Sequence, residues 1–171
     1  MGRPLLLAGL RLRARTVDTS ALPYETVMGA LEYIGENLRP PDLDEVRASG
    51  GGHPVEVLKQ SWAASARAWL ILDRTGLPVA AFGVAPALAP DVGVVWMLGT
   101  DGVEMEWVAV ARQTKAHLEQ MHEDFGVLWN FIDARNELSL QWLLRSGFHL
   151  IDADAAHGPE KRLFFEFART A

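Results

Sequence analysis

The sequence predicts a single-domain α/β protein, a three-layer sandwich in which helices flank a mixed, twisted sheet. Three observations predict it. A chain of 171 residues, 49% hydrophobic and 22% charged, has the size and balance of one globular domain with its own core. Strand-like and helix-like apolar patterns alternate along it. Their order, β-α-α-β-β-β-α-β-α-β-β, is typical of a mixed α/β sandwich. We expect one domain over residues 1–171.

The first third of the chain predicts one strand and two helices. Residues 10–16, "LRLRART", alternate apolar and basic side chains, as a half-buried strand does. Residues 24–38 carry apolar side chains at helical spacing, and "RPPD" at 39–42 is expected to stop that helix. Residues 43–53 predict a short helical turn that runs into three glycines. A proline then opens the second helix, 54–65.

Three strands and a long helix follow. Residues 67–73 and 77–85 flank "RTG", which predicts a hairpin, and residues 92–100 supply the next strand. The long helix is predicted over 102–125. Asp101 is expected to cap it, with Glu104 at capping-box spacing.

The C-terminal third predicts a strand, a helix and two more strands. The nearly unbroken apolar run at 127–134 indicates a strand buried on both faces. The last helix is predicted over 136–146, and Gly147 stands where a helix end favours a left-handed residue. Strands are expected at 148–154 and 162–169.

The element order and the pattern N-x-x-S-L-x-W-L-x-x-x-G-F at 136–148 resemble the GNAT (GCN5-related N-acetyltransferase) superfamily. Asn136, Ser139, Gly147 and Phe148 carry the match. The resemblance implies a GNAT-like fold and an acetyl-CoA-dependent transfer to an amine.

Four blocks, at 36–46, 68–84, 96–103 and 128–148, more closely resemble the GNAT-like family of short-tailed phages called internal virion protein A. This resemblance implies a phage or prophage origin and a role in virion assembly. The absence of cysteine and of a membrane-spanning run predicts a cytoplasmic protein, and the resemblance implies that it also associates with the virion.

The GNAT resemblance implies that backbone N–H groups of a glycine-rich turn, at the start of the long helix, hold the coenzyme pyrophosphate. This sequence departs from the pattern, because no Arg or Gln precedes the turn in frame and Asp101, Glu104 and Glu106 place negative charge there. We therefore expect acetyl-CoA to bind weakly or not at all. The residues that the resemblance assigns to the cofactor are Leu98, Gly99, Thr100, Gly102, Asn136 and Ser139.

The catalytic residues of the superfamily do not carry over. Leu143 occupies the position of the usual proton-donating tyrosine, and the strand at 92–100 lacks the glutamate that often serves as general base. Asp133 is the best-placed carboxylate for moving a proton, although an ion pair with Arg135 is the favoured interpretation. Asn136 has two interpretations, a helix cap, which we favour, and a contact to the pantetheine arm.

Charge and composition limit the partners. A net charge of −6 argues against a general nucleic-acid binder, and no apolar run approaches the roughly 18 to 20 residues of a membrane-spanning helix. No metal site is predicted, because no ligand cluster has metal spacing. Two functions remain: a diverged N-acetyltransferase with an unknown amine acceptor, or a non-catalytic virion-assembly protein that uses the scaffold to bind a phage structural protein. A homodimer stays open.

Overall fold

A computed structural model describes residues 13–171 of the chain. One sheet of seven strands runs through the described part, in the order β1-β2-β3-β4-β5-β7-β6. The strands are β1 (Arg15–Asp18), β2 (Arg67–Leu72), β3 (Pro78–Pro86), β4 (Val92–Gly99), β5 (Val127–Asp133), β6 (His149–His157) and β7 (Arg162–Thr170). The helices are α1 (Tyr24–Glu36), α2 (Pro40–Ala48), α3 (Pro54–Ala64), α4 (Gly102–Met105), α5 (Trp107–His122) and α6 (Glu137–Arg145), with a 3-10 turn at Thr19–Ala21.

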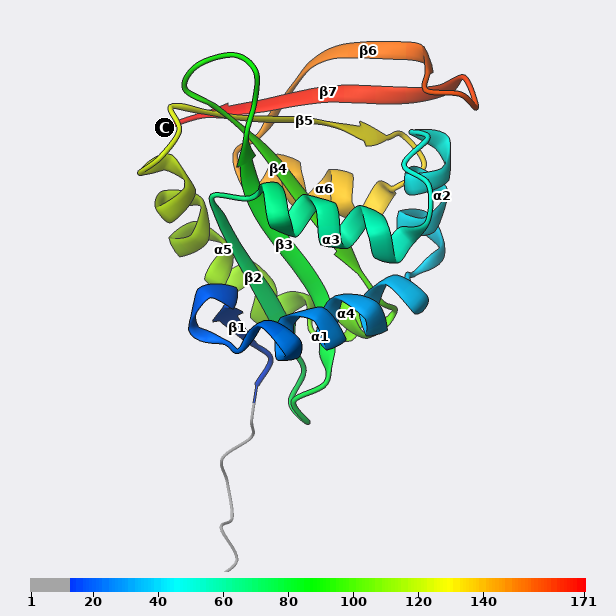
Figure 1. Ribbon diagram of the computed structural model, residues 1–171. Helices are drawn as coiled ribbons and strands as arrows, with labels where there is room; N and C mark the ends of the chain where they lie inside the picture. The colour runs from blue at the N-terminus through cyan, green and yellow to red at the C-terminus, as the bar shows by residue number, and fades with distance from the viewer. Residues whose placement is uncertain (1–12) are drawn as a thin grey trace, which may run out of the picture.

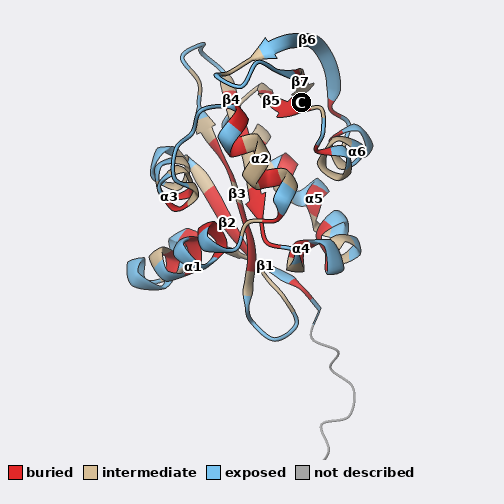
Figure 2. Ribbon diagram, turned by 90° about the vertical axis from the view of Figure 1, so that its right-hand side faces the viewer, coloured by how far each residue is buried: buried red, intermediate tan, exposed pale blue. Residues whose placement is uncertain are grey.

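The helices cover both faces of this sheet. Seen edge-on in Figure 2, α1 and α3 lie on one side, and α4, α5 and α6 lie on the other. All neighbouring strands are antiparallel except β4 and β5, which are parallel. The predicted class, a three-layer α/β sandwich with a mixed sheet, is therefore confirmed.

Each face of the sheet carries its own core, because side chains alternate along every strand. On the α5 and α6 side, Val95 and Leu128 pack with Leu118 of α5 and Leu143 of α6. On the other side the core is formed by residues of α1, α2 and α3 with alternate residues of β2, β3 and β4. The apolar side chains at helical spacing and those at alternate strand positions therefore meet in these two cores.

The two parallel strands separate after a short pairing. β4 and β5 pair only from Val92 with Val127 to Val94 with Trp129. Beyond that point the ladder stops, and the strands form a fork. The Asn130 side chain lies in it, donating from Nδ2 to the Val95 carbonyl at 2.7 Å while its Oδ1 accepts the Phe131 N–H at 2.7 Å.

The predicted short turn after the first helix is wrong. The first helix does end before "RPPD", as predicted, since α1 stops at Glu36. Pro40 and Pro41 then open α2, which is a full helix where we expected a short turn. Proline fits a first helical turn because the N–H that it lacks has no partner there. The predicted strand at 10–16 lies partly outside the described residues, and β1 begins at Arg15.

The predicted long helix is interrupted, and its predicted cap is wrong. A break at Glu106 divides the segment into α4 and α5. The Asp101 side chain caps nothing; the Gly102 N–H instead donates to Thr100 Oγ1 at 3.2 Å. The Glu104 side chain does not close a capping box either, because it turns toward Arg39, 3.4 Å away.

In the C-terminal third one prediction is corrected and one is confirmed. β5 is not buried on both faces, since Trp129 and Phe131 are partly exposed. Gly147 does end α6 in the left-handed region, with φ of +85°. Gly158, in the turn between β6 and β7, lies so close to the carbonyl of Ala48 that a Cβ would clash. The turn therefore packs against the end of α2.

The helices of residues 13–171 are all too short or too polar to cross a bilayer.

Candidate functional site

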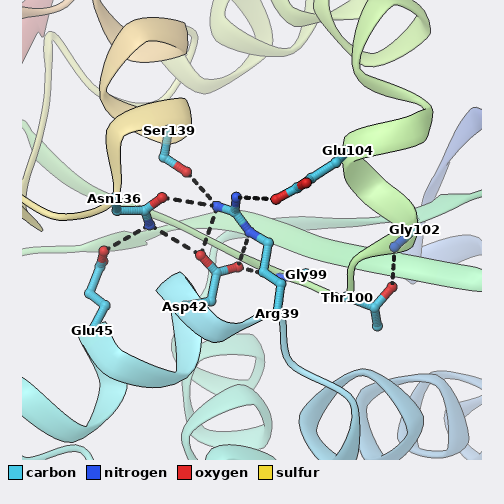
Figure 3. Close-up of polar contacts among 9 residues, drawn as sticks. All are labelled: Arg39, Asp42, Glu45, Gly99, Thr100, Gly102, Glu104, Asn136 and Ser139. Atoms are coloured by element: carbon cyan, nitrogen blue, oxygen red, sulfur yellow. Dashed lines mark hydrogen bonds and ion pairs between the residues drawn. The ribbon is translucent and has the colours of Figure 1, made fainter.

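A buried arginine links three helices at the mouth of the fork. Arg39, which directly precedes α2, is only 3% exposed. Its guanidinium donates to Asp42 of α2 at 2.8 and 3.0 Å, and to Ser139 Oγ of α6 at 2.6 Å. It also lies 3.4 Å from Glu104 of α4 (Figure 3). A single side chain therefore joins the first turns of α2, α4 and α6.

Asp42 pairs with this arginine and also reaches the backbone of β4. It is 2% exposed, and its Oδ2 accepts the Gly99 N–H at 2.8 Å. Burial raises the pKa of Asp42, against the lowering effect of the charge and hydrogen bonds of Arg39. A buried carboxylate thus occupies the backbone donor at the end of β4, which the GNAT resemblance assigned to a cofactor.

Asn136 is not a helix cap, so that prediction is wrong. It stands at the start of α6, but its side chain makes no capping hydrogen bond. Its Nδ2 donates to Asp42 and to Glu45 at 3.1 Å each, and its Oδ1 accepts from Arg39 at 3.2 Å. The amide is well suited to this place because it can donate to two carboxylates and accept from a cation at the same time.

Glu45 is the titratable group of this cluster. Burial, together with repulsion from Asp42 and Asp133, raises its pKa to about 7, although Asn136 donates to it. The side chain is only half-buried and lines the fork from the α2 side. Glu45 therefore changes its charge near neutral pH.

The turn from β4 to α4 has few donors to offer a phosphate. The Thr100 N–H donates to the Val79 carbonyl at 2.8 Å, and the N–H groups of Val103 and Glu104 donate to carbonyls within the turn. Gly99 and Gly102 donate to side chains, as described above. Arg39, the nearby cation, is already surrounded by acceptors. The residues present do not fit a pyrophosphate.

Asp133 lies at the end of β5, and the predicted ion pair with Arg135 is present. The two side chains approach to 2.6 Å, and Arg135 donates to both carboxylate oxygens. Burial acts to raise the pKa of Asp133, but the hydrogen bonds from Arg135 outweigh it and lower the pKa. A carboxylate held charged in this way is a poor proton acceptor.

The fork opens into a cavity of about 230 Å³. Its walls are mainly apolar and come from both sides of the sheet, including Phe82, Trp96, Phe131 and Trp142. Its polar groups come from Glu45, Asn130, Asn136 and Ser139, and Leu98 is also part of the wall. Of the cofactor residues predicted from the sequence, the structure brings Gly99, Asn136 and Ser139 together around Arg39 and Asp42 (Figure 3).

Groups that move protons are scarce around the fork. Leu143, at the position where the resemblance implies a tyrosine, is buried in the core. Tyr24 and Tyr33, the two tyrosines of the sequence, both lie on α1. No group of three or more metal-ligating side chains occurs in the part of the chain that the structure describes.

The sequence did not reveal Arg39, Asp42 or Glu45 as site residues. A weak signal was present, since an Arg and an Asp three residues apart lie on one side of a helical turn. The sequence hides this signal because prolines that follow one helix can also open the next.

The chain has the fold of the GNAT acetyltransferases. No protein-family model and no curated protein sequence matches it. Solved structures do. A GCN5-related N-acetyltransferase from Kribbella flavida is 13% identical, with a TM-score of 0.60 over 92% of this chain and 98% of that chain. The matching chain of the NatC complex bound to Gag peptide and CoA is 11% identical, with a TM-score of 0.65 over 94% of this chain and 99% of that chain.

A third structure, the ribosomal-protein-S18-alanine N-acetyltransferase from Escherichia coli, is 14% identical, with a TM-score of 0.58 over 92% of this chain and 93% of that chain. Identities this low establish the common fold alone. The similarity spans almost the full length of each chain.

Proposed function

We propose that this chain is a GNAT-fold protein of phage or prophage origin that binds a protein partner during virion assembly and does not transfer acetyl groups. One observation carries the proposal: the Asp42 carboxylate holds the Gly99 N–H, at the place where the fold would offer backbone donors to a pyrophosphate. The four blocks that resemble internal virion protein A support the phage origin. The host cytoplasm and the virion are the expected locations.

The energetics of the cluster support the same proposal. A phosphate entering here would meet the carboxyl groups of Asp42, Glu104 and Glu45, and it would have to remove Arg39 from its partners. Separating a buried ion pair leaves an uncompensated charge, which is costly. Binding of the cofactor would therefore have to offset both the repulsion and the lost pair.

Isothermal titration calorimetry with acetyl-CoA and with CoA tests this proposal. We expect no binding tighter than about 10 μM, which corresponds to about −7 kcal/mol. Tighter binding of either compound by the wild-type protein would overturn the proposal. Unchanged folding in the assay buffer, followed by circular dichroism, is the control.

A second function is favoured by one specific observation. The fork remains open, and Glu45, with a pKa of about 7, lines it. A group of this pKa is suited to accept a proton from an amine near neutral pH. This geometry supports the alternative, a diverged N-acetyltransferase with an unknown amine acceptor.

Thiol release from acetyl-CoA in the presence of a panel of primary amines separates the two functions. The chain contains no cysteine, so the protein itself contributes no thiol signal. We expect the wild-type protein to match the protein-free control. Amine-dependent release that is lost in Glu45→Gln would establish the enzyme instead.

A further inference from the structure

One face of the sheet lacks a helix over part of its width. In Figure 1, α3 lies below β5 and β7, and no helix covers the middle of these strands on that side. β6 is the edge strand, and every residue from His149 to Ala156 is exposed. Contiguous exposed patches of apolar side chains, unlike single exposed ones, mark sites of interaction with other molecules.

The uncovered face carries a row of aromatic rings. The Trp129 and Phe131 rings lie 5.2 Å apart, edge to face. Phe131 then contacts His157 at 4.8 Å, and His157 stacks on Phe164 at 4.4 Å. Trp129, Phe131 and His157 are partly exposed, so water reaches this row.

Carboxylates lie beside the rings on the same face. Phe131 and Glu166 are paired across β5 and β7, and Glu166 and Asp152 are paired across β7 and β6. Glu166 also accepts a hydrogen bond from the Trp129 indole N–H. Asp154 follows one row further along β6, where it contacts His157 at 3.2 Å. Trp129, Phe131, Asp152, Asp154 and Glu166 together are called the aromatic–acidic face below.

Two of these carboxylates face each other without a cation. Glu166 and Asp152 are direct cross-strand partners, and like charges at such positions destabilise a sheet. Within residues 13–171 neither of them is in an ion pair, whereas Asp154 contacts the His157 ring at 3.2 Å. The repulsion would be relieved by a positive group bound from outside.

We propose that the aromatic–acidic face binds an extended, arginine-bearing segment of a partner protein. A guanidinium can stack on an aromatic ring and donate two hydrogen bonds to a carboxylate, so it matches both features of this face. The rows of Asp152 and Asp154 are two residues apart along β6, about 7 Å. Alternate side chains of an extended peptide have the same spacing. This inference rests on the proposed function, because it names the surface and the chemistry of the partner.

The edge of β6 itself is a poorer docking place than its face. Asp152 Oδ1 accepts the Ala153 N–H at 2.7 Å, and Asp154 Oδ1 accepts the Ala156 N–H at 3.0 Å. Backbone N–H groups that already donate to the chain's own side chains are not available to pair with an added strand. Two irregularities in the pairing of β6 with β7 also disfavour the addition of a strand at this edge.

The probe for a test is the peptide Ac-(Arg-Val)4-NH2, titrated calorimetrically into the full chain at low salt. The variant is Asp152→Asn with Glu166→Gln, and the matched control is Glu25→Gln with Glu36→Gln. The control removes two exposed charges from α1, on a different part of the surface. Both variants therefore change the net charge equally.

We expect the face variant to bind the peptide at least tenfold more weakly than the wild type, and the control variant to stay within about twofold. The Trp129 indole resonance, assigned with Trp129→Phe, should shift on titration. No binding by the wild type, or equal weakening in both variants, would overturn the proposal. Acetyl-CoA calorimetry on the same protein decides the proposed function separately, so the two failures are distinguishable.

Discussion

Arg39 donates a hydrogen bond of 2.6 Å to Ser139, a residue one hundred positions further along the chain. Through this contact the first turn of α6 is joined to the residue that directly precedes α2. The same guanidinium holds Asp42, so one side chain fixes the mouth of the β4–β5 fork. Its loss should affect both the stability of the fold and the access to the fork.

Arg39→Ala should lower the free energy of unfolding by about 3 to 5 kcal/mol, because it leaves Asp42 buried without its cation. Urea denaturation measures the loss. The control is Arg67→Ala, whose ion pairs with Glu123 and Asp124 lie at the surface and should contribute about 1 kcal/mol or less. Equal losses in the two variants would show that Arg39 and Asp42 do not form a buried ion pair.

Asn136→Asp should be more destabilising than Asn136→Ala. The aspartate would place a third carboxylate against Asp42 and Glu45 and could not donate to either of them. A helix cap would give the opposite order, since Asp caps as well as Asn. Denaturant midpoints of the two variants at pH 8 separate these roles. A nearly neutral Asn136→Asp would restore the capping role.

The stability of the wild type should fall relative to Glu45→Gln as pH rises from about 4.5 to about 7. The pKa of Glu45 is raised from 4.5 to about 7 in the folded protein. The folded state therefore binds this proton more tightly than the unfolded state does. The resulting stability is complete below the unfolded pKa and is lost as pH approaches the folded one.

The size of this difference should be about 1 to 3 kcal/mol, allowing for partial solvent exposure of Glu45. Burial lowers the pKa of His117, which gives a trend of opposite sign in the acidic range. That trend is common to both proteins and cancels in the difference. Parallel stability curves for wild type and Glu45→Gln between pH 4.5 and 7 would contradict the assignment.

Gly147→Ala should cost about 1 kcal/mol, because a Cβ is strained at φ of +85°. The added Cβ would meet nothing closer than Arg169 Nε at 3.4 Å, so the loss is conformational and not steric. The matched control is Gly29→Ala within α1, where a Cβ meets nothing within 4 Å. That change should stabilise the protein by about 0.5 to 1 kcal/mol. The two denaturation midpoints should therefore move in opposite directions.

The sequence by itself determined the elements whose apolar pattern is long and regular. Apolar spacing predicts α1, α3 and the central strands, because a helix or strand with one apolar face has one way to bury it. The left-handed end of α6 is predicted by the glycine that follows this helix. The element order then indicated the sandwich. The start of α2 at Pro40 and the break between α4 and α5 at Glu106 could not be predicted in this way, because proline can follow one helix or begin another and the helical pattern continues across Glu106.

Only the tertiary structure decided what the polar residues do. Asn136 resembles a cap as long as its own helix is considered alone, and it becomes a bridge once α2 brings Asp42 and Glu45 against it. Arg39 becomes a buried cation only because Asp42, Ser139 and Glu104 converge on it from three helices. Hydrogen bonds and ion pairs depend on distances of a few ångströms between residues far apart in the chain. Local sequence patterns do not contain those distances.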